Sequence, residues 1–309
     1  MAKYLACGNI MSDTVIQKDG SYGALHIGGP AMFALAGIRT FTADCKLVCG
    51  AGADYEDSYG KWLDVNGLSR ESVRVVCEHC TQHVIHHFDD NSYKSESRFG
   101  AEVLGYMKTH PGHISHAISA DTKAFYLAQN DDLVYWKSIA YLKEKTGVKM
   151  MWEMESNVTD LERLKKVIFI PEMFSLNHFE ASNLFGIPRE NDEDIINELM
   201  KFGCDLVYYR VGPRGAYVIS GNRAVFCESV DPYGESVDPT GCGNCSTGAA
   251  MFAFMEGYDL AMTAAIAAVA AGFNAAQYGP VPYVDAGVTE TAFDISYEVA
   301  RKIRKKYGG

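Results

Sequence analysis

The chain alternates short apolar runs with stretches in which apolar residues recur every three or four positions, and this pattern predicts strands that are followed by helices. We expect an opening strand over 3–8 and, after a Gly-Gly-Pro run, an apolar helix over 31–37. A short buried strand over 47–49 and a helix over 58–66 come next. Strand, helix and strand in this order indicate a parallel sheet.

The segment from 73 to 99 interrupts this rhythm. It is rich in β-branched, aromatic and histidine residues, and Asp-Asp-Asn-Ser at 89–92 is a typical turn sequence. We expect a β-hairpin without an intervening helix, which forms a small β-lid over about 73–100, with 13–25 as a second candidate segment of the lid. The exposed edge strand of this hairpin would be able to pair with a strand of another molecule, so we also predict a homodimer that pairs through the lid.

The alternation resumes after the hairpin, and no internal repeat or low-complexity linker appears. We therefore expect one domain over 1–309, an α/β fold with a doubly wound sheet, helices on both faces and the small β-lid. The predicted strands are 124–128, 149–153, a strand near 168–169, 206–210, and the pair 215–220 and 223–227. The predicted helices are 133–146, 161–166, 179–185, 193–202, an alanine-rich buried helix over 261–276, and a solvated helix end at 301–306.

Composition narrows the class of partner. With 309 residues and 48% hydrophobic content, the chain can bury a large core, and its net charge of −11 argues against a nucleic-acid partner. Residues 1–13 lack a basic start and a long apolar run, so we expect the nine cysteines to be reduced thiols in the cytoplasm. The apolar stretch over 261–276 is short for a membrane span, and no membrane association is expected.

The strongest chemical signal is Asp-Pro-Thr-Gly-Cys-Gly-Asn at 238–244. Two glycines flank one small residue, and the apolar stretch 249–255 follows at once. The backbone N–H groups of Gly241, Cys242 and Gly243 are therefore expected to point outward at a helix N-terminus. This arrangement predicts a site for a phosphate or another oxyanion.

Other polar residues have two possible roles each. Asp13 follows the opening strand and is suited to hold vicinal hydroxyls, although it can also be a plain turn residue. Asn177 and Glu180 have helical spacing and can cap a helix as well as bind a ligand. Arg210 can bind a phosphate through two hydrogen bonds, or it can pair with an acidic residue of the predicted doubly wound α/β domain.

These motifs, in this order, resemble those of the ribokinase family, the pfkB-type carbohydrate kinases, along nearly the whole chain. The loop 238–244 is similar to the family's second signature, Asp-Thr-Thr-Gly-Ala-Gly-Asp, and the glycine pair at 28–29 is similar to its first. The other matches are the Gly-x-x-x-x-Asp turn at 8–13, the segment 50–54 with Gly60, the Asn-x-x-Glu element at 177–180, and the strand and turn at 207–215. The resemblance implies a ribokinase-like fold.

The resemblance also implies roles for single residues. Asp13, Gly28 and Gly29 would bind the sugar, and the loop N–H groups of Gly241, Cys242 and Gly243 would stabilise the transferring phosphoryl group. A second set would bind the nucleotide and its ions. ATP would lie against Arg210, Gly212, Gly215 and Asn274, and Asn274 would contact the adenine. Mg²⁺ would be held through water by Asn177 and Glu180. A monovalent cation such as K⁺ would be held by Asp238 and Thr240.

The chain departs from the family pattern at the chemical centre. Asn244 stands where the family has its general-base Asp, and a carboxamide cannot accept a hydroxyl proton. Met11 and Phe33 make the sugar pocket more apolar, unless they are core residues without a ligand. Glu153 and Glu155 lie where family members vary with substrate, so plain ribose is a poor candidate.

Two functions remain open. The first is an ATP-dependent kinase, weakened at Asn244, that phosphorylates a hydroxyl of a sugar or sugar-like molecule. The alternative is an inactive pseudokinase that binds nucleotide or sugar as a sensor or partner protein. General-base catalysis contributes roughly 10²- to 10⁴-fold, so Asn244→Asp should raise kcat by that factor in the first case and change little in the second.

Two Cys-x-x-Cys pairs invite a zinc interpretation. Cys77 and Cys80 have histidines nearby, but on a strand His79 and His83 would share one face while Cys80 and His86 share the other, so four ligands do not converge. The second pair begins at Cys242, inside the anion loop, where the family commonly has a small residue.

Overall fold

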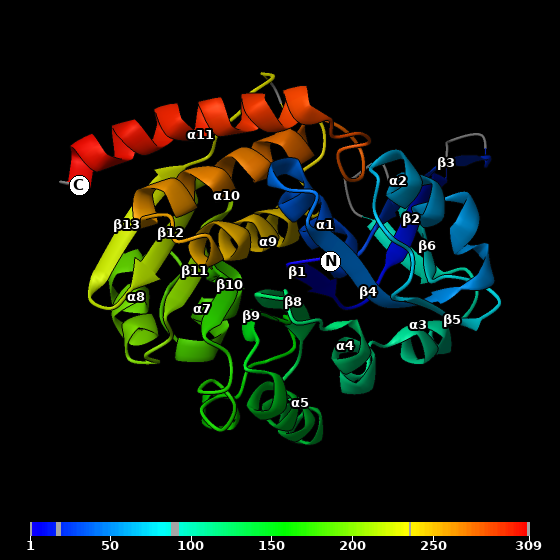
Figure 1. Ribbon diagram of the computed structural model, residues 1–309, viewed down its shortest axis with the longest axis horizontal. Coiled ribbons are helices and arrows are strands. Elements are labelled where there is room, and N and C mark those ends of the chain that lie inside the picture. Colours follow the sequence, from blue (N-terminus) through cyan, green and yellow to red (C-terminus); the bar gives the residue numbers. More distant parts are fainter. Residues whose placement is uncertain (1, 17–19, 88–92, 235, 308–309) are drawn as a thin grey trace.

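A computed structural model describes residues 2–16, 20–87, 93–234 and 236–307. The described residues form a nine-stranded sheet flanked by helices and a separate four-stranded sheet (Figure 1). This confirms the predicted α/β fold with helices on both faces of a large sheet and a small second sheet.

The large sheet has the strand order β13-β12-β11-β10-β9-β8-β1-β4-β5. Adjacent strands are parallel from β5 to β11, and β12 and β13 add antiparallel at one edge. The strands are β1 (Tyr4–Cys7), β4 (Cys45–Gly52), β5 (Val73–Cys77), β8 (Ala124–Gln129), β9 (Lys149–Met154), β10 (Met173–Asn177), β11 (Leu206–Arg210), β12 (Gly215–Ser220) and β13 (Arg223–Glu228). The chain winds away from β1 in both directions, which makes the β1/β8 boundary the topological switch point of the sheet.

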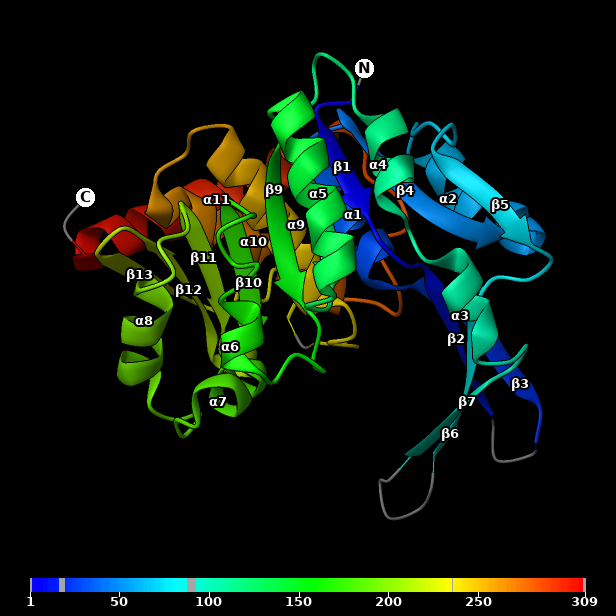
Figure 2. The ribbon, with the colours of Figure 1, turned by 90° about the horizontal axis from the view of Figure 1, so that it is seen from below.

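Helices cover both faces of this sheet, as Figures 1 and 2 show. One face carries α1 (Pro30–Phe41), α9 (Cys242–Met255), α10 (Leu260–Ala275) and α11 (Ala286–Tyr307). The other face carries α4 (Pro111–Ala117), α5 (Leu133–Thr146), α6 (Leu161–Leu164), α7 (His178–Phe185) and α8 (Asp192–Met200). The shorter helices are α2 (Tyr59–Val65), α3 (Glu102–Met107) and the 3-10 turns η1 (Ala53–Asp57) and η2 (Gly212–Arg214).

Burial on both faces explains why the central strands are apolar throughout. In β1, Tyr4 and Ala6 pack into the core under α1 and α9, while Leu5 and Cys7 pack into the opposite core. All four residues are fully buried. A strand with a core on each side has a continuous apolar run, which is the pattern that predicted this strand from the sequence.

The small sheet has the order β3-β2-β6-β7 and projects from one end of the molecule (Figure 2). It consists of β2 (Met11–Ile16), β3 (Tyr22–Gly28), β6 (Gln82–His87) and β7 (Tyr93–Ser97). The central pair β2 and β6 is parallel, and each outer strand is antiparallel to its neighbour. Strands β2 and β3, which overlap the two ends of the predicted segment 13–25, therefore supply half of this sheet.

Two expectations for individual strands are wrong in their placement. Residues 73–77 do not belong to the small sheet, because β5 pairs in parallel with β4 and completes an ordinary strand-helix-strand unit of the large sheet. The expected strand near 168–169 is a turn after α6, where Val167 and Ile170 make i to i+3 backbone hydrogen bonds and Phe169 is exposed. The strand that follows is β10, and the expected turn at 89–92 lies outside the described residues.

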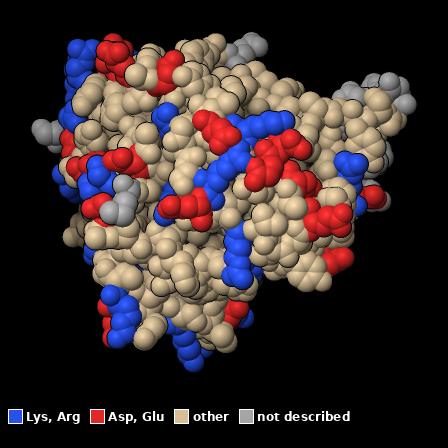
Figure 3. Space-filling view, turned by 45° about the vertical axis from the view of Figure 1, so that its right-hand side comes forward, with Lys and Arg blue, Asp and Glu red and all other residues tan. Residues whose placement is uncertain are grey.

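Acidic and basic side chains are interspersed over the face shown in Figure 3. Within the described ranges, no helix combines the length and apolarity that crossing a membrane requires.

Candidate active site

The predicted anion loop opens α9, a helix of 14 residues. Gly241 is its N-cap in a left-handed conformation, with φ of 77°. A Cβ atom at this position would lie 2.2 Å from the ring of Phe33, so both the backbone angle and the close contact require glycine. The first turn of α9 leaves backbone N–H groups without intrahelical acceptors, which suits the loop for an anion.

Contacts with α10 fix the path of this loop. The N–H groups of Val237 and Asp238 both donate to the carbonyl of Ala275, and Asp238 accepts from the N–H of Thr240 at 2.9 Å. The buried amide of Asn274 donates to the carbonyl of Thr240 at 2.9 Å. Asn274 thus holds the loop in place from α10. Its contact with adenine stays a prediction, and so does a monovalent cation at Asp238 and Thr240.

Asn244 belongs to a hydrogen-bonded chain that the sequence did not reveal. Its amide Nδ2 donates to the hydroxyl of Tyr126 at 3.0 Å, and this hydroxyl donates to Glu153 Oε2 at 2.8 Å. Burial, followed by the charge of Glu153, raises the pKa of Tyr126 far above its usual range, so the phenol keeps its proton. The carboxamide of Asn244 is therefore oriented with its Nδ2 atom committed to Tyr126, which leaves Oδ1 as its free acceptor.

Arg210 continues this chain from the end of β11. Its Nη1 lies 2.9 Å from Glu153 Oε1, and its Nη2 lies 3.8 Å from Glu180 Oε2, which is too long for a hydrogen bond. A Cβ atom on Gly243 would lie 2.1 Å from Nη1, so the guanidinium lies directly against the anion loop. The buried Nε and Nη2 atoms have no hydrogen-bond partner among the described residues.

The Asn-x-x-Glu element forms the capping box that its spacing predicted. Asn177 Oδ1 accepts from the N–H groups of Phe179 and Glu180, and Glu180 Oε2 accepts from the N–H of Asn177 at 2.7 Å. Burial raises the pKa of Glu180, although the nearby Arg210 acts in the opposite direction. One oxygen of this carboxylate is thus committed to the helix cap.

The turn between β11 and β12 is shaped by its two glycines. Gly212 and Gly215 both have positive φ, 65° and 128°, and a Cβ atom on Gly215 would lie 2.0 Å from the carbonyl oxygen of Cys227. These glycines are needed for the chain path, whatever they contact in a complex.

The ring of Phe33 lies against both the glycine pair 28–29 and the anion loop. A Cβ atom on Gly28 would lie 2.8 Å from the Phe33 ring, the same ring that covers Gly241. Gly29 has φ of 93°, and a Cβ atom there would lie 2.6 Å from the backbone nitrogen of Met11. Phe33 is 4% exposed, so it acts as a packed wedge between the two glycine segments.

Asp13 lies in the middle of a ladder of polar residues across the small sheet. Its register partners are His26 on β3 and His83 on β6. His83 Nδ1 lies 3.4 Å from Asp13 Oδ1, and the hydrogen bond with Asp13 raises the pKa of His83. The ring of His26 lies against that of Tyr278, with centroids 5.1 Å apart and the planes tilted by 35°. The sequence analysis proposed Asp13 for hydroxyl binding but did not place His26 or His83 beside it.

A cavity of about 260 Å³ lies at the switch point, beside the carboxyl ends of β1 and β8. Its lining includes Gly8, Asn9, Lys108, Gln129, Asn130 and Glu155. Burial raises the pKa of Glu155, and its carboxylate makes no hydrogen bond or ion pair with other described residues. Ligands of open α/β sheets bind at this kind of crevice, so the cavity is the candidate acceptor pocket.

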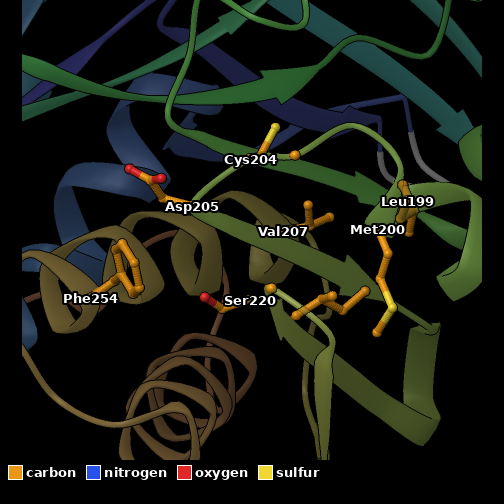
Figure 4. A pocket seen from close by; sticks show the side chains of 10 residues that line it. Leu199, Met200, Cys204, Asp205, Val207, Ser220 and Phe254 are labelled. Carbon is orange, nitrogen blue, oxygen red and sulfur yellow. The ribbon is translucent and has the colours of Figure 1, made fainter.

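A larger cavity of about 370 Å³ lies at the opposite ends of the strands (Figure 4). Its lining includes Leu199, Met200, Asp205, Ser220 and Phe254, around the start of β11 and the β12–β13 turn. It lies away from the carboxyl ends of the sheet, where the switch point is found. We therefore place the candidate site at the switch point.

The described residues contain no group of three His, Cys, Asp or Glu side chains arranged to hold a metal ion. This bears on the zinc interpretation, since a structural zinc site needs four converging ligands. At Glu180 in particular, one oxygen caps α7 and also faces the guanidinium of Arg210. Because a fixed cation already lies there, the residues present do not fit a Mg²⁺ ion organised by this carboxylate.

Comparison with known proteins gives a family and a fold. Residues 9–285 match the pfkB family carbohydrate kinase. A search of the curated proteins finds no match.

Similar solved structures cover almost the whole chain. A putative ribokinase II from E. coli in complex with ATP and Mg²⁺ has a TM-score of 0.76 at 16% identity, covering 97% of this chain and 100% of its own. Arabidopsis thaliana ribokinase complexed with ribose and ATP has a TM-score of 0.75 at 17% identity, with 96% and 99% covered. A Burkholderia thailandensis nucleoside kinase in complex with ADP-inosine has a TM-score of 0.71 at 18% identity, with 96% and 95% covered. At these identities the similarity shows the fold.

Proposed function

Because the chain belongs to the pfkB family of carbohydrate kinases, we propose that it transfers the terminal phosphoryl group of ATP to a hydroxyl of a sugar or nucleoside. The observation that carries the proposal is the glycine loop at the start of α9, held against both Phe33 and Arg210. The loop N–H groups of Gly241, Cys242 and Gly243 would stabilise the charge of the transferring group, which is the main catalytic contribution in phosphoryl transfer.

The acceptor would lie between the small sheet and the switch-point cavity. Asp13 would hold its hydroxyls, with Gly28, Gly29 and Met11 beside it, and Glu155 would accept hydrogen bonds from the part that extends into the cavity. The buried position of Phe33 supports a packing role in place of direct substrate contact. ATP would lie along Gly212, Gly215 and the loop, with a monovalent cation at Asp238 and Thr240.

Asn244 would orient the reacting hydroxyl without removing its proton. Its Oδ1 can accept a hydrogen bond from the acceptor while Nδ2 stays bound to Tyr126. As the acceptor oxygen bonds to phosphorus, the bond to the ADP oxygen breaks, and the hydroxyl proton goes to water. Positioning and electrostatic stabilisation can supply most of the rate enhancement without a base.

The second candidate is a pseudokinase that binds nucleotide or sugar without turnover. The observation that favours it is the carboxamide of Asn244, which lacks proton acceptance and is already engaged by Tyr126.

Turnover separates the two candidates. ADP release would be measured with ATP and a library of sugars and nucleosides, and binding of the same compounds would be measured by thermal shift. The kinase proposal expects acceptor-dependent ADP release that Gly243→Val abolishes, because the new side chain would collide with Arg210. Stabilisation by ligands without ADP release for any acceptor would refute the kinase proposal in favour of the pseudokinase.

A further inference from the structure

Arg210 is the most unusual charged residue of the candidate site. Its side chain is 13% exposed and extends from the end of β11 between two acidic side chains, Glu153 at 2.9 Å and Glu180 at 3.8 Å. Only Nη1 is used in a short contact, and the buried Nε and Nη2 remain without partners among the described residues. Buried donors that lack an acceptor are costly, so two on one guanidinium indicate a ligand.

The position of the guanidinium indicates the ligand's chemistry. Nη1 would be only 2.1 Å from a Cβ atom on Gly243, so the guanidinium touches the first turn of α9. The guanidinium therefore lies beside a helix turn whose backbone N–H groups have no intrahelical acceptors. Both are donors that match phosphate oxygens, and arginine can bind two such oxygens at once.

We propose that Arg210 supplies the fixed positive charge for the terminal phosphates of the nucleotide, so that nucleotide binding does not require a divalent cation. This inference rests on the proposed function, since it concerns the same nucleotide. Glu153 holds the guanidinium in place, and Glu180 caps α7. A guanidinium keeps its charge at every physiological pH, so it can serve permanently where a Mg²⁺ ion would have to be recruited.

The test compares nucleotide binding with and without the metal. Calorimetry with ADP and with a non-hydrolysable ATP analogue would be done in EDTA and in excess MgCl₂. The wild-type dissociation constant should change by less than about threefold between the two buffers, because the protein's own cation pairs with the phosphates.

Variants assign the effect to Arg210. Arg210→Thr should weaken binding in EDTA by about tenfold to a hundredfold, the size expected for lost charge-assisted hydrogen bonds, with partial recovery in MgCl₂. Since this change leaves Glu153 buried without its partner, the double variant Arg210→Thr/Glu153→Gln removes both charges and should behave in the same way. Arg304→Thr is the matched control, because Arg304 pairs with Asp259 on the exposed surface and should leave binding unchanged.

The outcomes separate this inference from the proposed function. Wild-type binding that occurs only in MgCl₂ would overturn the inference and leave the kinase proposal standing. Binding in neither buffer would overturn both. Glu180→Gln gives an independent check, because it should preserve metal-independent binding, whereas a loss confined to MgCl₂ would identify Glu180 as a metal-organising residue and contradict the inference.

Discussion

The amide of Asn244 and the hydroxyl of Tyr126 form a 3.0 Å hydrogen bond in which Asn244 is the donor. The direction is set by Glu153, which accepts the single hydroxyl proton of Tyr126 at 2.8 Å. The carboxylate of Glu153 therefore lies two hydrogen bonds away from Asn244.

These two hydrogen bonds change the effect that Asn244→Asp should have on kcat. A carboxylate at position 244 would face the lone pair of Tyr126, whose proton Glu153 already accepts, so two carboxylates would compete for one hydrogen. We expect the single variant to gain little in kcat. The double variant Asn244→Asp/Glu153→Gln should gain roughly 10²- to 10⁴-fold, because the new amide at position 153 can donate to Tyr126, whose hydroxyl can then donate to the new carboxylate at position 244.

Steady-state kinetics on the best acceptor would measure this difference. Glu153→Gln alone is the control, and it should not raise kcat because Asn244 still lacks a base. Equal and full activation by the single and double variants would show that the Tyr126–Glu153 pair does not constrain position 244.

Acceptor binding should depend on pH through Asp13 and His83. Because the pKa of His83 is raised, its ion pair with Asp13 stabilises the folded protein fully below the ordinary histidine pKa of about 6.5. This stabilisation is lost as pH rises through the higher folded-state pKa of His83. Neutral His83 releases the Asp13 carboxylate for hydroxyl groups, so the acceptor KM should fall as pH increases through this range. His83→Gln should flatten the KM profile, and a profile identical to that of the wild type would exclude His83 as its source.

Close packing of α1 on α9 should make Gly37 sensitive to a single methyl group. A Cβ atom on Gly37 would lie 2.0 Å from the carbonyl oxygen of Cys245, in the same helix that carries the anion loop. Gly37→Ala should lower the free energy of unfolding by about 1–3 kcal/mol, as overpacking does.

Urea denaturation would measure this loss of stability. Gly112→Ala is the matched control, since a Cβ atom at Gly112 meets nothing within 4 Å, and it should change stability by less than about 1 kcal/mol. Similar values for the two variants would show that the α1–α9 contact relaxes without cost.

Homodimer formation through the small sheet stays a prediction, and the structure indicates where to test it. Strand β3 is an outer strand of this sheet, and its Tyr22 and Leu25 are exposed. Light scattering at micromolar concentration should give the mass of a dimer, and Leu25→Lys should shift it to that of a monomer, because a charged side chain blocks pairing at an edge. A monomeric wild type would rule out this interface.

Local patterns in the sequence determined much of the fold and the loop. The capping box at Asn177 and Glu180, the glycines at 241 and 243, and the alternation of strands and helices depend on backbone hydrogen bonds and backbone angles within a few residues. Such features are readable from a window of sequence because their physical cause lies inside the window. The strand β11 was predicted with its observed bounds for the same reason.

Only the tertiary structure decided which side chains meet. Tyr126, Glu153, Arg210 and Asn244 come from β8, β9, β11 and α9, and no spacing along the chain relates them. They converge because the parallel strands run side by side, and the register of β8 against β9 brings Ala128, two residues after Tyr126 on the same face of β8, opposite Glu153. Nonlocal pairing also explains why residues 73–77, expected in the small sheet, belong to the large one, where β5 pairs with β4. Sequence alone thus predicted most of the elements and the anion loop. The charges around that loop depend on strand order, which is set by burial across the whole sheet.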